Sequence, residues 1–154
     1  MAITVQTNDG LSTANSYVSV TDFDAYTMAR GIAITGNPEQ LLLSAMDVLE
    51  SKQYKSEPLK SDQSTKWPRM GLGVPRDIKQ SQLMLAVAAD TNDLLSATTE
   101  QITKSEQVDV IKVEYFESKD AVNGSPLLTL VNELLAPYLA STRGVAMNVR
   151  VFRG

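Results

Sequence analysis

The sequence predicts a mostly α-helical domain of four helices, with an inserted β-hairpin and a C-terminal β-strand arm. Apolar residues recur at helical spacing in four segments. Residues 102–117 and the C-terminal tail instead alternate at period two, which indicates strands. A length of 154 residues fits one domain. We therefore expect a single domain over residues 1–154, with a helical core over 1–142 and an arm over 143–154.

The first helix is predicted by its two ends. Ser19 is followed three residues later by Asp22, the spacing of a capping box at a helix N-terminus. The helix should run from about Val20 to Arg30. Gly31 follows as the expected C-terminal stop, since glycine adopts the left-handed conformation that ends many helices.

The second helix begins with a clear start signal. Asn37 is a favourable N-cap, and Pro38 suits the first helical position because its missing N–H needs no partner there. A buried stripe then follows at i, i+3, i+4 and i+7, made of Leu42, Ala45, Met46 and Leu49. We expect this helix to fade near Tyr54.

A rigid run precedes the third helix and is the most informative stretch of the chain. It contains the only tryptophan, Trp67, followed by Pro68 and Arg69, with Pro75 at the expected helix start. We interpret these four residues as a structural joint that sets the angle of the third helix. Trp67 is either a core anchor of its own chain or an inter-subunit contact, and the sequence leaves both open.

The third helix should extend for about twenty residues from Pro75. One apolar face is made of Ile78, Gln82, Leu85, Ala86 and Ala89. Alanines on this helix leave room for another helix to approach closely. The fourth helix should start at residues 123–126, and Pro137 should kink or end it.

Two segments are predicted to be strands. Residues 102–117 alternate as a hairpin with a bend near residues 107–109, although the turn chemistry there is weak. In the tail, apolar and polar residues alternate, so a strand there would carry one apolar face. Such a terminal strand must pair within its own sheet or with the edge of a partner's sheet. The candidate assembly contacts in this arm are Val145, Met147, Val149, Arg150, Val151, Phe152 and Arg153.

Composition excludes much chemistry. The chain has no cysteine and no histidine, so thiolate, imidazole and histidine–zinc sites are excluded. Asp22 and Asp24 point to different faces of a helix, and capping explains Asp22 better than catalysis does. We therefore expect no catalytic residue, no cofactor and no metal, and hence no enzyme. No signal peptide or membrane-spanning stretch is visible, so we expect a cytoplasmic protein without a membrane partner.

The net charge of −4 argues against a long phosphate-binding track. The basic residues between Lys52 and Lys79 are interleaved with acidic ones, which is more typical of a solvated surface of mixed charge. An acidic protein could still surround DNA without gripping it.

Four blocks of the sequence resemble a known family. The blocks are Asn15-Ser16-Tyr17-Val18-Ser19-Val20 with Ala25-Tyr26 and Arg30-Gly31; Trp67-Pro68-Arg69 with Val74-Pro75, Ile78-Lys79-Gln80 and Ala86; Lys104-Ser105-Glu106 with Val108 and Val113-Glu114-Tyr115; and Leu134-Leu135-Ala136-Pro137-Tyr138-Leu139. Together they resemble the tailed-phage head–tail connector family, which is also catalogued as putative DnaT-like single-stranded-DNA-binding proteins. The likeness covers roughly residues 1–140, and the tail departs from it.

The resemblance implies a four-helix adaptor-type domain and a structural virion protein without catalytic residues. Such a protein would form a ring, expected to be a dodecamer, that joins the portal protein to a tail terminator or to a stopper or neck protein. The ring would line the channel for genomic double-stranded DNA without sequence-specific binding. It would assemble in the host cytoplasm and reside in the virion neck. Removal of residues 144–154 should then leave the fold intact and abolish head–tail joining.

The alternative is a replication-type protein that binds single-stranded DNA. That function calls for a basic groove with side chains on which bases stack, and the sequence alone offers neither clearly.

Overall fold

The computed structural model describes residues 2–91, 94 and 126–140, and these residues form four helices. In chain order the helices are α1 (Val20–Ala29), α2 (Pro38–Ser51), α3 (Arg76–Thr91) and α4 (Pro126–Leu135). The prediction of a mostly helical protein with four helices is confirmed. In the described part, β structure is limited to isolated bridges. The hairpin at residues 102–117 and the strand of the 143–154 arm lie outside the described residues.

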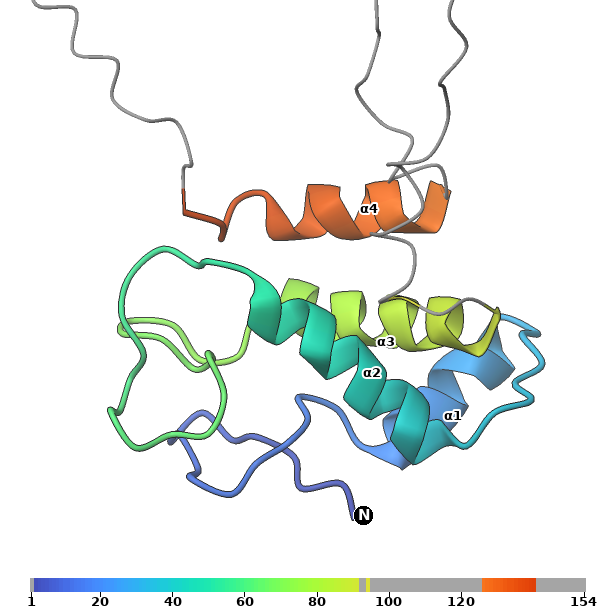
Figure 1. Cartoon of the computed structure of the whole chain (residues 1–154), viewed down its shortest axis with the longest axis horizontal. Helices are drawn as coiled ribbons and strands as arrows, with labels where there is room; N and C mark the ends of the chain where they lie inside the picture. The colour runs from blue at the N-terminus through green and yellow to red at the C-terminus, as the bar shows by residue number, and fades with distance from the viewer. Residues whose placement is uncertain (1, 92–93, 95–125, 141–154) are drawn as a thin grey trace, which may run out of the picture.

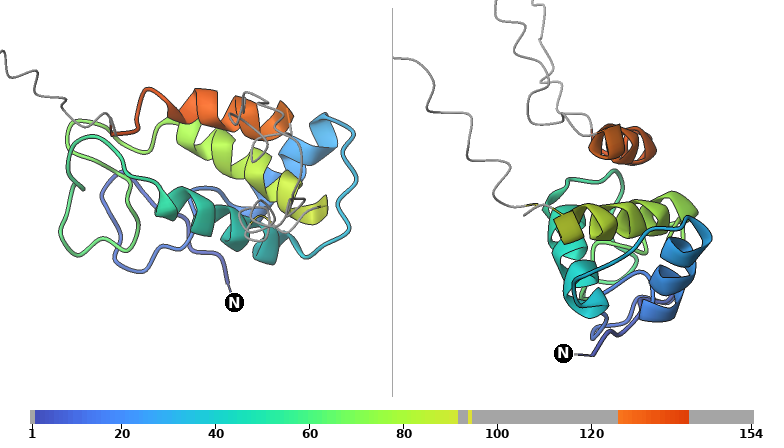
Figure 2. Two further views of the ribbon diagram at one scale, coloured as in Figure 1. Left: turned by 45° about the horizontal axis from the view of Figure 1, so that its top comes forward. Right: turned by 90° about the vertical axis from the view of Figure 1, so that its right-hand side faces the viewer.

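Helix α3 lies at the centre of the arrangement and packs against each of the other three helices. Figure 1 shows α4 along one side of α3, with α2 crossing α3 on the other. Viewed along the molecule in Figure 2, α1 and α2 lie on either side below α3, and α4 lies above it. The N-terminal segment and the long loop between α2 and α3 fill the end of the molecule away from α1.

The helix ends follow the local chemistry of the sequence. Ser19 and Asp22 form the complete capping box: the Ser19 hydroxyl accepts from the Asp22 N–H at 3.1 Å, and the Asp22 carboxylate accepts from the Ser19 N–H at 3.2 Å. Asn37 caps α2 by accepting from the Glu39 N–H at 2.9 Å. Gly31 has a φ of 64°, the left-handed conformation expected of a residue that ends a helix.

The end of α2 differs from the sequence pattern, whereas the end of α4 follows the prediction from Pro137. Helix α2 stops at Ser51 because Tyr54 leaves the helix and forms an antiparallel bridge with Leu139. Helix α4 stops at Leu135, since the residue before Pro137 is disfavoured in the helical conformation. The bridge joins the chain after α2 to the chain after α4, with the Lys55 N–H donating to the Tyr138 carbonyl at 2.8 Å.

The core lies between α2, α3 and α4 and is mostly aliphatic. Its most buried residues are Phe23, Leu42, Ala45, Leu49, Ile78, Leu85, Ala86 and Leu135. Polar residues are buried there too. Among these, Gln82 is fully buried, and its amide accepts from the Tyr17 N–H and donates to Ser16 and to the Leu42 carbonyl. Because all of these bonds are made, Gln82 fixes the N-terminal segment and α2 against α3.

Candidate functional site

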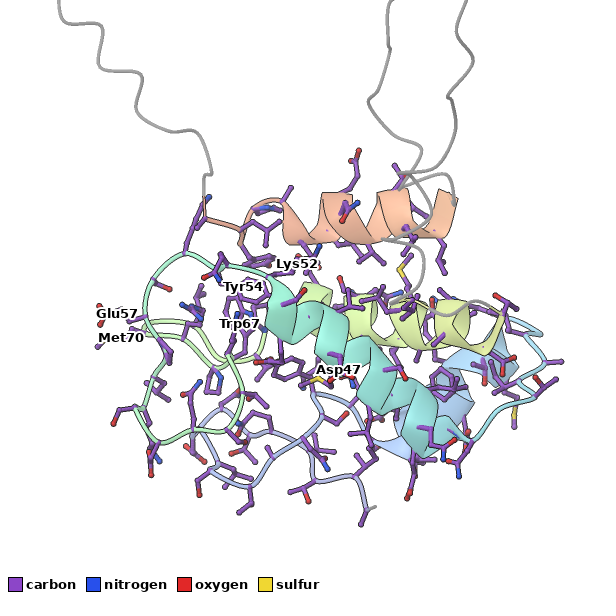
Figure 3. All side chains as sticks on the ribbon, in the orientation of Figure 1. Asp47, Lys52, Tyr54, Glu57, Trp67 and Met70 are labelled. Atoms are coloured by element: carbon purple, nitrogen blue, oxygen red, sulfur yellow. The ribbon has the colours of Figure 1, made fainter. Side chains whose placement is uncertain are left out.

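Trp67 occupies the centre of a buried aromatic cluster. It is 1% exposed, and its ring meets Tyr54 and Tyr138 edge to face at centroid distances of 5.5 and 5.6 Å. Figure 3 shows Trp67 and Tyr54 together behind the end of α2. The peptide bond to Pro68 is cis. The chain itself covers Trp67, so its ring is not accessible to a ligand.

Arg69 is a cation used within the fold. It is 7% exposed, and its guanidinium donates to the carbonyls of Lys55 at 2.7 Å, Lys66 at 2.8 Å and Ser56. These carbonyls belong to the loop between α2 and α3, which has no regular ladder to satisfy them. Arg69 therefore holds this loop together and is not free to meet an external anion.

A half-buried carboxylate lies beside this aromatic cluster. Glu50 accepts from the Tyr17 hydroxyl and, at 2.9 Å, from the backbone N–H of Lys66. The Tyr17 hydroxyl oxygen also accepts from the backbone N–H of Trp67. Burial raises the pKa of Glu50 above its usual value, and burial with the nearby Glu50 charge raises the pKa of Tyr17. Both groups connect α2 to the N-terminal segment and to the loop, so they act in the fold.

The predicted structural joint is thus only partly brought together. Trp67, Pro68 and Arg69 form one buried unit, whereas Pro75 lies half-buried directly before α3. Its role in setting the helix angle stays a prediction. The candidate assembly contacts Val145, Met147, Val149, Arg150, Val151, Phe152 and Arg153 lie outside the described residues.

Charged and polar side chains that a ligand could reach line a groove formed by three helices. We name it the α1–α3–α4 groove; it has a cavity volume of about 410 Å³. Its lining consists of Arg30, Arg76, Asp77, Gln80, Met84, Leu130 and Leu134. Arg76, Gln80 and Met84 recur every four residues and form one row on α3, which spans about 12 Å at the helical rise. Leu130 and Leu134 form the facing row on α4.

The polar groups of this groove are held by specific contacts. The Arg30 guanidinium stacks on the Tyr26 ring, 3.7 Å from its centroid. Asp77 accepts from the Tyr138 hydroxyl at 2.8 Å, and this hydrogen bond raises the pKa of Tyr138. Arg76 is exposed at the first position of α3. The groove thus offers two arginines, one carboxylate, one amide and an apolar floor.

Sequence reasoning missed this groove because its residues come from three separate helices. A signal was present in the local charge, however. Residues 52–79 contain seven basic and three acidic residues, and the rest of the chain contains seven basic and fifteen acidic ones. The net charge of −4 therefore hides a basic segment that includes the start of α3.

The described residues give no support to two other kinds of site. Among residues 2–91, 94 and 126–140, no cluster of three or more acidic side chains could hold a metal ion. In the same ranges, no helix has the length and apolar character needed to cross a bilayer.

Comparison with known proteins gives one match. The model of a family described as "Putative DnaT-like ssDNA binding protein" matches residues 1–154. No curated protein and no solved structure matches the chain.

Proposed function

The chain belongs to the putative DnaT-like ssDNA-binding protein family, and on this premise we propose that it binds single-stranded DNA through the α1–α3–α4 groove. The family match over the whole chain supports the function. The pair of arginines above an apolar floor supports this location.

The predicted ring-forming head–tail adaptor is wrong. The matched family is described by DNA binding and not by a role in the virion, which agrees with the alternative drawn from the sequence. The total charge of −4 conceals a sequence feature that favours this alternative, because the basic segment at residues 52–79 is interleaved with acidic residues. The dodecameric ring, the portal and tail partners and the location in a virion neck were expected only as parts of that adaptor, and no observation on the described residues tests them separately.

The groove carries the two kinds of contact that a single strand needs. The guanidinium groups of Arg30 and Arg76 would bind phosphate oxygens through paired, charge-assisted hydrogen bonds. Unstacked bases would lie against Met84, Leu130 and Leu134, or on the face of an arginine, because any base can stack on a flat or apolar surface. The single observation that carries this location is the meeting of both arginines with exposed leucine, Leu130 being 55% exposed.

Asp77 makes the charge of the groove uneven, because it places one carboxylate beside the two arginines. Its carboxylate repels phosphate, so the DNA backbone would follow the two arginines and the bases would turn toward the floor. A duplex keeps its bases stacked inside and cannot make these floor contacts. We therefore propose a non-enzymatic protein that prefers single strands to duplex DNA, with little sequence preference.

The test compares charge-neutralising variants inside and outside the groove. Arg30→Gln and Arg76→Gln should each weaken binding of a labelled oligothymidine by at least about tenfold, since a charged hydrogen bond contributes about 1.5 kcal/mol or more. Fluorescence anisotropy at fixed low salt measures the affinity. Both residues are exposed, so the fold should be preserved.

Lys60→Gln is the matched control, because it removes the same charge from an exposed residue outside the groove. It should change the affinity for oligothymidine by less than twofold. Equal weakening by all three variants would show that charge alone matters and would contradict the location. No binding by the unchanged protein would contradict the function.

A further inference from the structure

A second groove lies in the loop between α2 and α3. We name it the loop groove; it is lined by residues 57–61, 63–66 and 70 and has a cavity volume of about 690 Å³. Figure 3 shows Glu57 and Met70 side by side at the outer edge of this loop, and the Met70 N–H donates to the Glu57 carbonyl at 3.0 Å. It shares no lining residue with the α1–α3–α4 groove.

Internal hydrogen bonds fix the walls of the loop groove. The Gln63 amide oxygen accepts from the Lys60 N–H at 3.0 Å, and its nitrogen donates to the carbonyls of Thr65 at 2.7 Å and Pro68 at 2.9 Å. The Ser64 N–H donates to the Leu11 carbonyl at 3.1 Å, which ties the loop to the N-terminal segment. A partner would therefore meet a preformed surface and lose little free energy to ordering it.

The lining combines apolar side chains with lysines. Met70 is 60% exposed and Leu59 is 38% exposed, so both present apolar surface to solvent. Lys60 is exposed, and the Lys66 ammonium donates to the Lys52 carbonyl at 2.6 Å, which uses one of its three donors. Glu57 is the single acidic residue of this lining. The groove therefore favours an anion that also carries apolar groups.

We propose that the loop groove binds an acidic peptide segment of a protein partner, with an aliphatic or aromatic side chain next to its carboxylates. The carboxylates would pair with Lys60 and Lys66, and the apolar side chain would cover Leu59 and Met70. Charge complementarity and the exposed apolar surface argue for this occupant. This binding site goes beyond the proposed DNA-binding function.

The same lining argues against DNA as the occupant. No arginine lines the loop groove, so it offers no guanidinium for paired hydrogen bonds to a phosphate and no guanidinium face on which a base could stack. Lysine acts as a point charge and suits a single carboxylate as well as a phosphate. Arg69, the nearest arginine in sequence, is buried and bound to three carbonyls.

The test uses a labelled peptide of four aspartates followed by two leucines, measured by fluorescence polarisation with the full chain. Lys60→Gln and Met70→Gln should each weaken its binding by about threefold to fivefold. The controls are Lys79→Gln on α3 and Met28→Gln on α1, which make the same changes outside the loop groove. They should change the affinity by less than twofold. A peptide with asparagine in place of aspartate should bind at least tenfold more weakly.

Three results would overturn the proposal: no binding at about 1 mM peptide, equal binding of the asparagine peptide, or equal effects of the groove and control variants. Competition by oligothymidine supplies a further arm. If the DNA displaces the peptide from the unchanged protein but not from Arg30→Gln, the peptide lies in the DNA groove and the assignment is wrong. Failure of DNA binding with intact peptide binding would contradict the proposed function alone.

Discussion

At the scale of single residues, Trp67 is the buried centre of the aromatic cluster. It brings together Tyr54 after α2 and Tyr138 after α4 by edge-to-face ring contacts. Its indole N–H is buried and has no hydrogen-bond partner in the described part of the chain. The stabilisation by Trp67 therefore comes from apolar contact area and ring geometry, and not from its polar atom.

Replacing Trp67 by alanine should lower the free energy of unfolding by about 3–5 kcal/mol, because it opens a large cavity between three chain segments. Chemical denaturation followed by circular dichroism measures this change. Met28→Ala is the control: this side chain is 80% exposed, and its removal should change stability by less than about 0.5 kcal/mol. A loss below about 1 kcal/mol for the Trp67 variant would contradict the anchoring role.

Glu50 should make stability depend on pH. Because burial raises its pKa in the folded state, the folded protein holds this proton more tightly than the unfolded chain does. The resulting stabilisation is fully present below the usual pKa of 4.5 and is lost as pH rises through the raised folded pKa. Glu50→Gln stays neutral at every pH. The unfolding free energy of the unchanged protein should therefore fall relative to this variant from about pH 4.5 upward.

Denaturation curves of both proteins between pH 4 and pH 8 test this expectation. The lowered pKa values of Asp22 and Asp90 act in the opposite sense, since their stabilisation is lost as pH falls below their usual value of 3.8. They lie outside this window and are unchanged in the variant. A constant difference between the two proteins across the range would show that Glu50 does not titrate as described.

At the scale of elements, α1 is a helix with little packing whose N-terminus is supported by its capping box. It contacts α2 and α3 less than α3 contacts α2 or α4, and it buries only Phe23 and Thr27. Ser19→Ala removes the hydroxyl that accepts from the Asp22 N–H, and should destabilise the protein by about 1 kcal/mol.

Amide hydrogen exchange of residues 20–29 together with denaturation measures this effect. Ser44→Ala in α2 is the matched control, since the Ser44 hydroxyl only donates to the Gln40 carbonyl within the same helix. It should change stability by less than about 0.5 kcal/mol. Equal effects of both substitutions would argue against the capping box as the support of α1.

The helices were predictable because their signals are local. Ser19 and Asp22, Asn37 and Pro38, and the stripe from Leu42 to Leu49 each specify a helix start or a buried face within a few residues. The early end of α2 was not predictable, because it depends on a bridge between Tyr54 and Leu139, eighty-five positions apart. Such pairing has no signature in the segment itself.

The candidate site, like the end of α2, depends on contacts between distant segments that no local signal in the sequence predicts. Arg30 directly follows α1, Arg76 lies on α3 and Leu130 on α4, and only the packing of these helices places the three residues in one groove. Arg69, by contrast, belongs to the family-like Trp-Pro-Arg run, yet its exposure could not be judged from the sequence. The structure shows it bound to three carbonyls of its own loop, so a conspicuous cation is structural and two less conspicuous ones are accessible.

At the scale of the whole molecule, an acidic protein presents a basic segment. Residues 52–79 have an excess of four positive charges, and the rest of the chain has an excess of eight negative ones. The acidic remainder of the chain offers DNA no favourable contact, so binding should be limited to the direct contacts of the two groove arginines. Few phosphates are then neutralised, which sets the salt dependence of the affinity.

The salt dependence of oligothymidine binding tests the central claim most directly. Two arginine–phosphate contacts predict that the logarithm of the affinity falls with the logarithm of salt concentration with a slope of about −1.4, since each contact to a single strand contributes about −0.7. A duplex of the same length should bind more weakly at every salt concentration. Absence of binding at low salt, a slope near zero, or equal affinity for the duplex would contradict single-strand binding in the α1–α3–α4 groove.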